Sequence, residues 1–168
     1  MLGKVAKGID IFNTKQGEVT SLLIFPLLIV VIYEVFMRYA FNAPTEWGFE
    51  VTNFLYGLHF MFGLAYTDVM DGHVKVDIFI TRFSPKVQAV FGIVTTCIFF
   101  LPVMSCLTVW TAKFAITSIA GMERNSTSWG PYIWPFKTLM ACCFLFLTVQ
   151  GISNLFKYIR ALKSGNNS

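Results

Sequence analysis

Residues 87–112 read VQAVFGIVTTCIFFLPVMSCLTVWTA, a run of 26 residues without a charged side chain. A helix that crosses the hydrocarbon core of a bilayer needs about 20 mostly apolar residues. This run is long enough to do so. It predicts that the chain crosses a membrane, and three further runs favour the same interpretation.

These three runs are shorter than the first. Between their bounding charges they contain 15, 17 and 19 uncharged residues, at 19–33, 51–67 and 138–156. Because the first two are short, Glu34 and Glu50 must lie inside helices or at their edges. We therefore predict one all-α integral membrane domain over residues 1–168, with four transmembrane helices at about 18–41, 47–69, 87–112 and 132–156.

The composition agrees with a membrane protein. Of the 168 residues, 55% are hydrophobic and only 13% are charged, whereas a soluble domain carries roughly 25% charge. This balance disfavours a disordered chain, a coiled coil and an ordinary cytosolic enzyme. The net charge of +4 is not gathered into a basic stripe, so we expect no nucleic-acid partner.

The distribution of basic residues predicts the orientation of the chain. With four spans and the N terminus inside, nine of the 13 Lys and Arg residues fall on the cytoplasmic side. The positive-inside rule then places both termini in the cytoplasm.

Three connecting segments have the character of membrane-surface elements. In the first of them, Val5 and Phe12 belong to an apolar set at helical spacing, opposite a polar face that contains Asp10. That pattern is typical of an amphipathic helix lying in the membrane plane. The segments are about 1–15, 73–86 and 113–122.

The middles of the four predicted spans contain no Asp, Glu, Lys or Arg. Transporters and pumps usually keep ionisable groups there. Glu34 and Arg38 are four residues apart on one helical face, so they can pair. Two interpretations stay open: a self-neutralised pair at a helix end, or a contact to another subunit or a lipid headgroup.

Two other function classes are weighed against a supporting role. A small proton-coupled exporter would use Glu34 as its coupling carboxylate, although Arg38 lies one turn away. A four-helix disulfide oxidoreductase would need paired cysteines, but the four cysteines fall within predicted spans and none forms a Cys-x-x-Cys motif. On one helix Cys97 and Cys106 would lie about 13 Å apart, beyond the roughly 4.4–6.8 Å Cα separation of a disulfide.

No cofactor is expected either. His59 and His73 would be about 21 Å apart on a continuous helix, too far to ligate one haem iron.

The 18 phenylalanines are more than four helices can bury against one another, since membrane bundles pack through small residues. Part of the surface should therefore face lipid or a larger membrane partner.

Several short motifs occur along the chain in an order and spacing that together are fairly specific. Arg38-Tyr39 ends the first predicted span and is followed by Thr45 to Glu50 (TEWGFE); then come Gly63 to Tyr66 (GLAY) and Gly72 to Asp77 (GHVKVD). Ser128-Trp129 and Ile133-Trp134-Pro135 precede the last span. Over almost its whole length the chain resembles the small membrane subunit (DctQ-type) of tripartite ATP-independent periplasmic (TRAP) transporters. It departs from that pattern at Asp68 and Asp71, where basic character is expected.

The resemblance implies a non-catalytic scaffold in the bacterial inner membrane. A large multi-span subunit would hold the substrate and sodium sites, and a periplasmic protein would deliver an organic acid of the sialic acid or C4-dicarboxylate class. The implied partners are that large subunit, the periplasmic binding protein and membrane phospholipids.

The resemblance also implies roles for particular residues. Contacts to the large subunit or to lipid are expected from Glu34, Arg38, Glu46, Trp47 and Glu50. Docking of the binding protein is expected from Lys113, Glu123, Arg124 and Trp129. The cytoplasmic turn should be ordered by His73 and Asp77.

Overall fold

The computed structural model describes residues 2–73 and 82–164. The regular elements of this part are all helices, and its only strand-like feature is an isolated antiparallel bridge between Arg124 and Tyr132. The predicted all-α fold is confirmed. The elements are α1 (Leu2–Ser21), α2 (Ile24–Ala40), α3 (Gly48–Val69), α5 (Pro85–Thr95), the π-helical turn η1 (Thr96–Phe100), α6 (Leu101–Ala120) and α7 (Trp134–Ser164).

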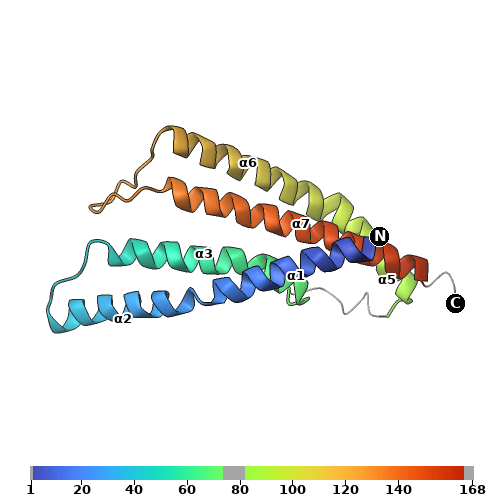
Figure 1. Cartoon of the computed structure of the whole chain (residues 1–168), viewed down its shortest axis with the longest axis horizontal. Helices are drawn as coiled ribbons and strands as arrows, with labels where there is room; N and C mark the ends of the chain where they lie inside the picture. Colours follow the sequence, from blue (N-terminus) through green and yellow to red (C-terminus); the bar gives the residue numbers. More distant parts are fainter. Residues whose placement is uncertain (1, 74–81, 165–168) are drawn as a thin grey trace.

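The helices form an elongated bundle whose consecutive passes run in opposite directions (Figure 1). The connections 41–47 and 121–133 lie at one end, which we call the loop end. α1 begins and α7 ends at the opposite end, which we call the terminal end. α7 is central, because it packs against α1, α3, α5 and α6.

Only three of the four predicted spans have the length and apolar character of a membrane-crossing helix. Among the described residues three helical stretches are long and apolar enough to cross a membrane: Gly3–Ala40, Pro85–Ala120 and Trp134–Lys163. α3 has sufficient length, with 22 residues, but it is not apolar enough to join them. Counting residues between charges overlooked the uncharged polar side chains of α3, which include Asn53 and His59.

Residues 2–15 belong to α1, which is longer than the expected surface segment. α1 runs to Ser21, and α2 begins only three residues later at Ile24, so Gly3–Ala40 forms one 38-residue candidate span. Within α1, Ala6 and Asn13 are buried, while Val5 and Phe12 are about half exposed.

The packing of α1 explains which of its side chains are buried. α1 lies against α3 and α7, and helices approach closely in membranes where small residues meet. At Gly17 an added Cβ would lie 2.5 Å from the Tyr66 side chain. A stripe of small and polar residues therefore faces the bundle, and larger apolar side chains face outward.

α5, η1 and α6 form one continuous helical stretch with a π-helical turn. Pro102 has no N–H, and the N–H of the preceding Leu101 donates to the carbonyl of Thr96 five residues earlier. A wider turn of this kind accommodates the missing donor. The helix then extends to Ala120, so most of the segment 113–122 prolongs the helix of the third predicted span.

α6 ends in a left-handed turn at Met122, whose φ is 44°. The N–H of Glu123 donates to the carbonyl of Ser118, and that of Met122 donates to the carbonyl of Ile119. This pair of bonds is the Schellman arrangement that satisfies the last carbonyls of a helix. The other expected surface segment, 73–86, lies mostly outside the described residues.

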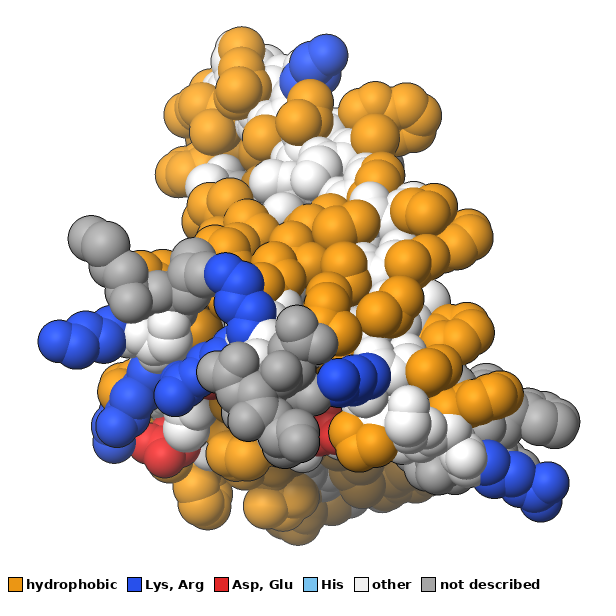
Figure 2. All heavy atoms as spheres, turned by 90° about the vertical axis from the view of Figure 1, so that its right-hand side faces the viewer, with side chains coloured by type: hydrophobic (Ala, Val, Ile, Leu, Met, Phe, Trp, Pro, Cys, Tyr) orange, Lys and Arg blue, Asp and Glu red, His pale blue; other side chains and the backbone are white. Residues whose placement is uncertain are grey.

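Large apolar side chains remain on the outside of the bundle (Figure 2). Ile29 on α2 is 66% exposed, and Trp110 on α6 is 74% exposed. The buried hydrophobic positions are instead mostly alanines, for example Ala65 and Ala115. The described bundle therefore presents an apolar outer surface, as the phenylalanine content predicted.

Candidate functional site

At the loop end, Glu34 organises the connection between α2 and α3. Its carboxylate accepts a hydrogen bond from Arg38 Nη2 at 3.0 Å and another from the Thr45 backbone N–H at 3.3 Å. The Thr45 hydroxyl also donates to it and accepts from the Gly48 N–H at 3.1 Å. Glu34 is thus held by the turn, while the Arg38 side chain is 55% exposed.

Glu46, Trp47 and Glu50 follow this turn. The Trp47 ring stacks on Tyr33 with their centroids 5.7 Å apart, and Glu46 is exposed. Glu50 is only 4% exposed. One of its oxygens accepts from the Thr127 hydroxyl, and Oε2 has no hydrogen-bond partner among the described residues. Glu50 therefore ties α3 to the 121–133 connection.

That connection is a short hairpin-like loop. The Asn125 N–H donates to the Pro131 carbonyl at 2.9 Å, and the Ile133 N–H donates to the Glu123 carbonyl at 3.1 Å. Arg124 Nη2 donates to the Tyr132 hydroxyl at 2.7 Å, and its guanidinium lies 4.3 Å from the centre of the Tyr132 ring. These contacts order the loop on the outside of the bundle.

The residues expected to dock a binding protein differ in how they are held. Lys113, Arg124 and Trp129 are exposed, whereas Glu123 is partly buried and forms an ion pair with Lys137. Lys137 is only 8% exposed, and its ammonium lies 3.7 Å from the centre of the Phe114 ring. Glu123 thus holds the loop onto α7 as well as facing outward.

The Glu123–Lys137 pair predicts a pH dependence. The hydrogen bond from Lys137 holds the pKa of Glu123 below its ordinary value of 4.5. A lowered pKa stabilises the folded chain above pH 4.5, and this contribution is lost as the pH falls through the lower folded-state value. The unfolding temperature should therefore fall less on acidification in Lys137→Met than in the parent chain. Scanning fluorimetry at about pH 7 and about pH 3.5 measures this difference, and an equal fall in both chains would contradict it.

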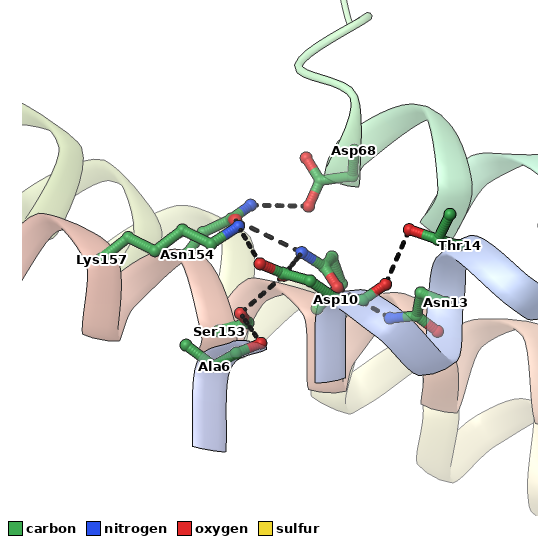
Figure 3. Close-up of polar contacts among 9 residues, drawn as sticks. Ala6, Asp10, Asn13, Thr14, Asp68, Ser153, Asn154 and Lys157 are labelled. Carbon is green, nitrogen blue, oxygen red and sulfur yellow. Dashed lines mark hydrogen bonds and ion pairs between the residues drawn. The ribbon is translucent and has the colours of Figure 1, made fainter. Parts of the chain in front are cut away.

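The terminal end contains a larger polar cluster, shown in Figure 3, which we call the terminal network. It joins α1, α3 and α7 through side chains that are far apart in the sequence. Its members are Asp10, Asn13, Asp68, Gln150, Ser153, Asn154 and Lys157.

Gln150 lies at the centre of the terminal network and is 0% exposed. Its Oε1 accepts from Asn13 Nδ2 at 2.8 Å, and its Nε2 donates to Asp10 Oδ1 at 2.9 Å. Ser153 Oγ also donates to Asp10 Oδ1 at 2.9 Å. Buried polar groups are stabilising when they are paired in this way, so the cluster joins α1 firmly to α7.

The network continues toward α3 and the surface. Asn154 Nδ2 donates to Asp68 Oδ2 at 2.7 Å. Lys157 Nζ forms an ion pair with Asp10 Oδ2 at 2.9 Å and donates to Asn154 Oδ1 at 3.3 Å. Asp68, which departs from the expected basic character, therefore joins α3 to α7.

Sequence reasoning missed the terminal network as a site. The available signal was the spacing of Gln150, Ser153, Asn154 and Lys157 at positions i, i+3, i+4 and i+7 of one helix. Residues at this spacing share one face, and a polar face within an apolar helix points to a polar partner. The partner could not be found from α7 alone, because Asp10 lies 140 residues away from Gln150.

The two histidines lie on separate contacts. His59 Nδ1 is 3.3 Å from the Thr20 carbonyl oxygen and links α3 to α1. His73 Nε2 is 3.2 Å from the Leu64 carbonyl oxygen at the end of α3. Asp77, expected to act with His73, lies outside the described residues.

Two alternatives weighed from the sequence find no support in the geometry. In the described chain Glu34 is occupied by Arg38 and Thr45. The four cysteines, Cys97, Cys106, Cys142 and Cys143, are all free. Among the described residues no group of three or more His, Cys, Asp or Glu side chains could hold a metal ion.

The fold and its two polar ends define a helical membrane protein whose polar residues join helices to one another. The family model of the DctQ component of tripartite ATP-independent periplasmic transporters matches residues 27–161, which is most of the chain. The chain belongs to this family, and it is thus a small, non-catalytic transporter component. Partners of the DctQ component in these transporters are a large membrane subunit and a periplasmic binding protein. A comparison with curated proteins gives no significant match.

Proposed function

We propose that the chain is the fixed scaffold of a sodium-coupled importer in the bacterial inner membrane, with α3 as a fourth membrane pass and both termini in the cytoplasm. The imported substrate is an organic acid of the sialic acid or C4-dicarboxylate class. It is delivered by the periplasmic binding protein and moved by the large subunit. Membrane phospholipids cover the remaining outer surface of the chain.

The observation that carries this proposal is where the polar side chains are used. The terminal network joins α1, α3 and α7 to one another, and Glu34 and Glu50 hold connections at the loop end. A transport path needs ionisable groups that can exchange partners. Here these groups are engaged in joining helices, as a rigid support requires.

The apolar outer surface supports the same role. α2 packs mainly against α3, and its described side chains are largely exposed apart from buried Leu27. The exposed Arg38 and the Tyr33–Trp47 stack lie at the loop end of this helix. We therefore assign the large-subunit interface to the outer face of α2, continued by Arg38, Glu46 and Trp47.

The loop end supplies the surface for the binding protein. The hairpin-like 121–133 loop is fixed by Glu123–Lys137 and Arg124–Tyr132, and Trp129 on it is 44% exposed. Fixed loops with an exposed aromatic residue suit a docking surface, because little ordering is lost on binding.

Co-purification tests the scaffold role. The tagged chain, expressed with the untagged large subunit and the binding protein, should retain the large subunit and bind no organic acid by itself. Binding of sialic acid or a C4-dicarboxylate to the purified chain alone would overturn the proposal, and so would failure to retain the large subunit.

A further inference from the structure

A pocket of about 230 Å³ lies at the terminal end between the start of α1 and the end of α7. Its lining contains three basic side chains, Lys7, Lys157 and Arg160, and one acidic side chain, Asp10. Figure 2 shows Lys and Arg side chains gathered on this end of the molecule. The excess of positive charge favours an anionic ligand.

The one carboxylate in the pocket is already engaged. Asp10 Oδ1 accepts from Gln150 and Ser153, and Asp10 Oδ2 pairs with Lys157. An ammonium has three donors, and Lys157 uses one on Asp10 and one on Asn154. The third N–H of Lys157 therefore remains for a ligand, on a side chain whose position the terminal network fixes.

The Arg160 side chain lies against Gly3, which has no side chain of its own. A Cβ at Gly3 would lie 2.6 Å from Arg160 Nη1, so the guanidinium lies directly over the glycine backbone. Within residues 2–73 and 82–164 no carboxylate pairs with either Lys7 or Arg160. A guanidinium and an ammonium held at one opening are the groups that bind phosphate oxygens.

The pocket lies where lipid headgroups are expected. The 38-residue stretch Gly3–Ala40 is about 57 Å long, whereas the hydrocarbon core is about 30 Å thick. α2 is strongly apolar, whereas α1 begins with Lys4 and Lys7 in its first two turns. The start of α1 therefore lies among headgroups, where a phosphodiester is the abundant anion.

We propose that this pocket binds the phosphate of an anionic phospholipid headgroup through Lys7, Lys157 and Arg160. Such a lipid would brace α1 against α7 on the outer side of the terminal network. The proposal needs only that the chain lies in a membrane, and it does not depend on the proposed scaffold role.

The test uses the purified full chain in neutral detergent, titrated with phosphatidylglycerol, with the bound lipid counted by native mass spectrometry. Lys7→Gln with Arg160→Gln should weaken lipid binding about tenfold. The matched control, Lys4→Gln with Lys163→Gln, removes the same charge from exposed positions at the same end that do not line the pocket. It should change binding less than about twofold. Equal losses in both variants would show general surface attraction and overturn the proposal, as would no loss in either.

A second variant separates pocket shape from charge. Gly3→Leu keeps every charge but displaces the Arg160 guanidinium, so it should also lose lipid binding while the helical content by circular dichroism stays unchanged. Unchanged binding in Gly3→Leu would contradict the proposed site. Soluble glycerol phosphate distinguishes the two sources of phosphate: it should not displace the lipid at equal concentration, and displacement would show a site for free phosphate instead.

Discussion

Replacing Gln150 by alanine should destabilise the folded chain by about 2–3 kcal/mol. Gln150 is fully buried and bonds to both Asn13 and Asp10. Its truncation leaves a cavity and removes the partner of a buried amide. For a chain of this size the unfolding temperature should fall by roughly 5–10 °C, which thermal unfolding in detergent monitored by circular dichroism can measure.

Two variants control this experiment. Gln88→Ala removes a half-buried glutamine that makes one described bond, to the Phe83 carbonyl, and it should change the stability by less than about 0.5 kcal/mol. Gln150→Leu keeps most of the volume but not the hydrogen bonds, so it separates the cavity from the polar loss. If Gln150→Ala were no more harmful than Gln88→Ala, the terminal network would not hold the bundle together.

Replacing two isoleucines on α2 by tryptophan should disrupt assembly with the large subunit. Ile29 and Ile32 are 66% and 58% exposed in the isolated chain, on the face that we assign to that interface. Larger side chains overpack a protein–protein contact, but they are tolerated against lipid tails. The double variant should retain at least about tenfold less large subunit in co-purification, which corresponds to about 1.4 kcal/mol.

A matched pair on the other side of the bundle controls for the substitutions themselves. Ile98 on η1 and Ile116 on α6 are 60% and 65% exposed, and the same change to tryptophan there should leave co-purification intact. If the Ile98 and Ile116 variant lost the large subunit while the α2 variant kept it, our assignment of the interface would be reversed.

The fold was predictable where local sequence determines it. Residues 87–112 have no charge and are helical throughout, and the Glu34–Arg38 pair forms because its members are one helical turn apart. The number of spans was not predictable from charge alone, because the uncharged polar residues of α3 also lower its apolar character. The helix is interrupted at Leu22 and Leu23 instead of near residue 15, because Pro26 has no N–H to donate to the carbonyl of Leu22, which accepts from Phe25 instead.

Among the site residues, contacts between neighbours in the sequence were predictable and contacts between distant residues were not. Contacts between residues distant in sequence, such as Glu50 with Thr127 and Asp10 with Gln150, depend on which helices become neighbours. In α1 the small and polar residues Ala6 and Asn13 pack inward in the bundle, whereas the apolar Val5 and Phe12 are about half exposed. In a membrane the solvent is apolar as well, so the hydrophobic pattern does not by itself identify the buried face.

The central claim is that this chain supports transport without performing it. The most direct measurement compares uptake of labelled sialic acid or C4-dicarboxylate in cells that express the large subunit and the binding protein, with and without this chain. We predict that uptake disappears when only this chain is missing and returns when it is supplied from a plasmid. Full uptake in cells that lack only this chain would contradict the account.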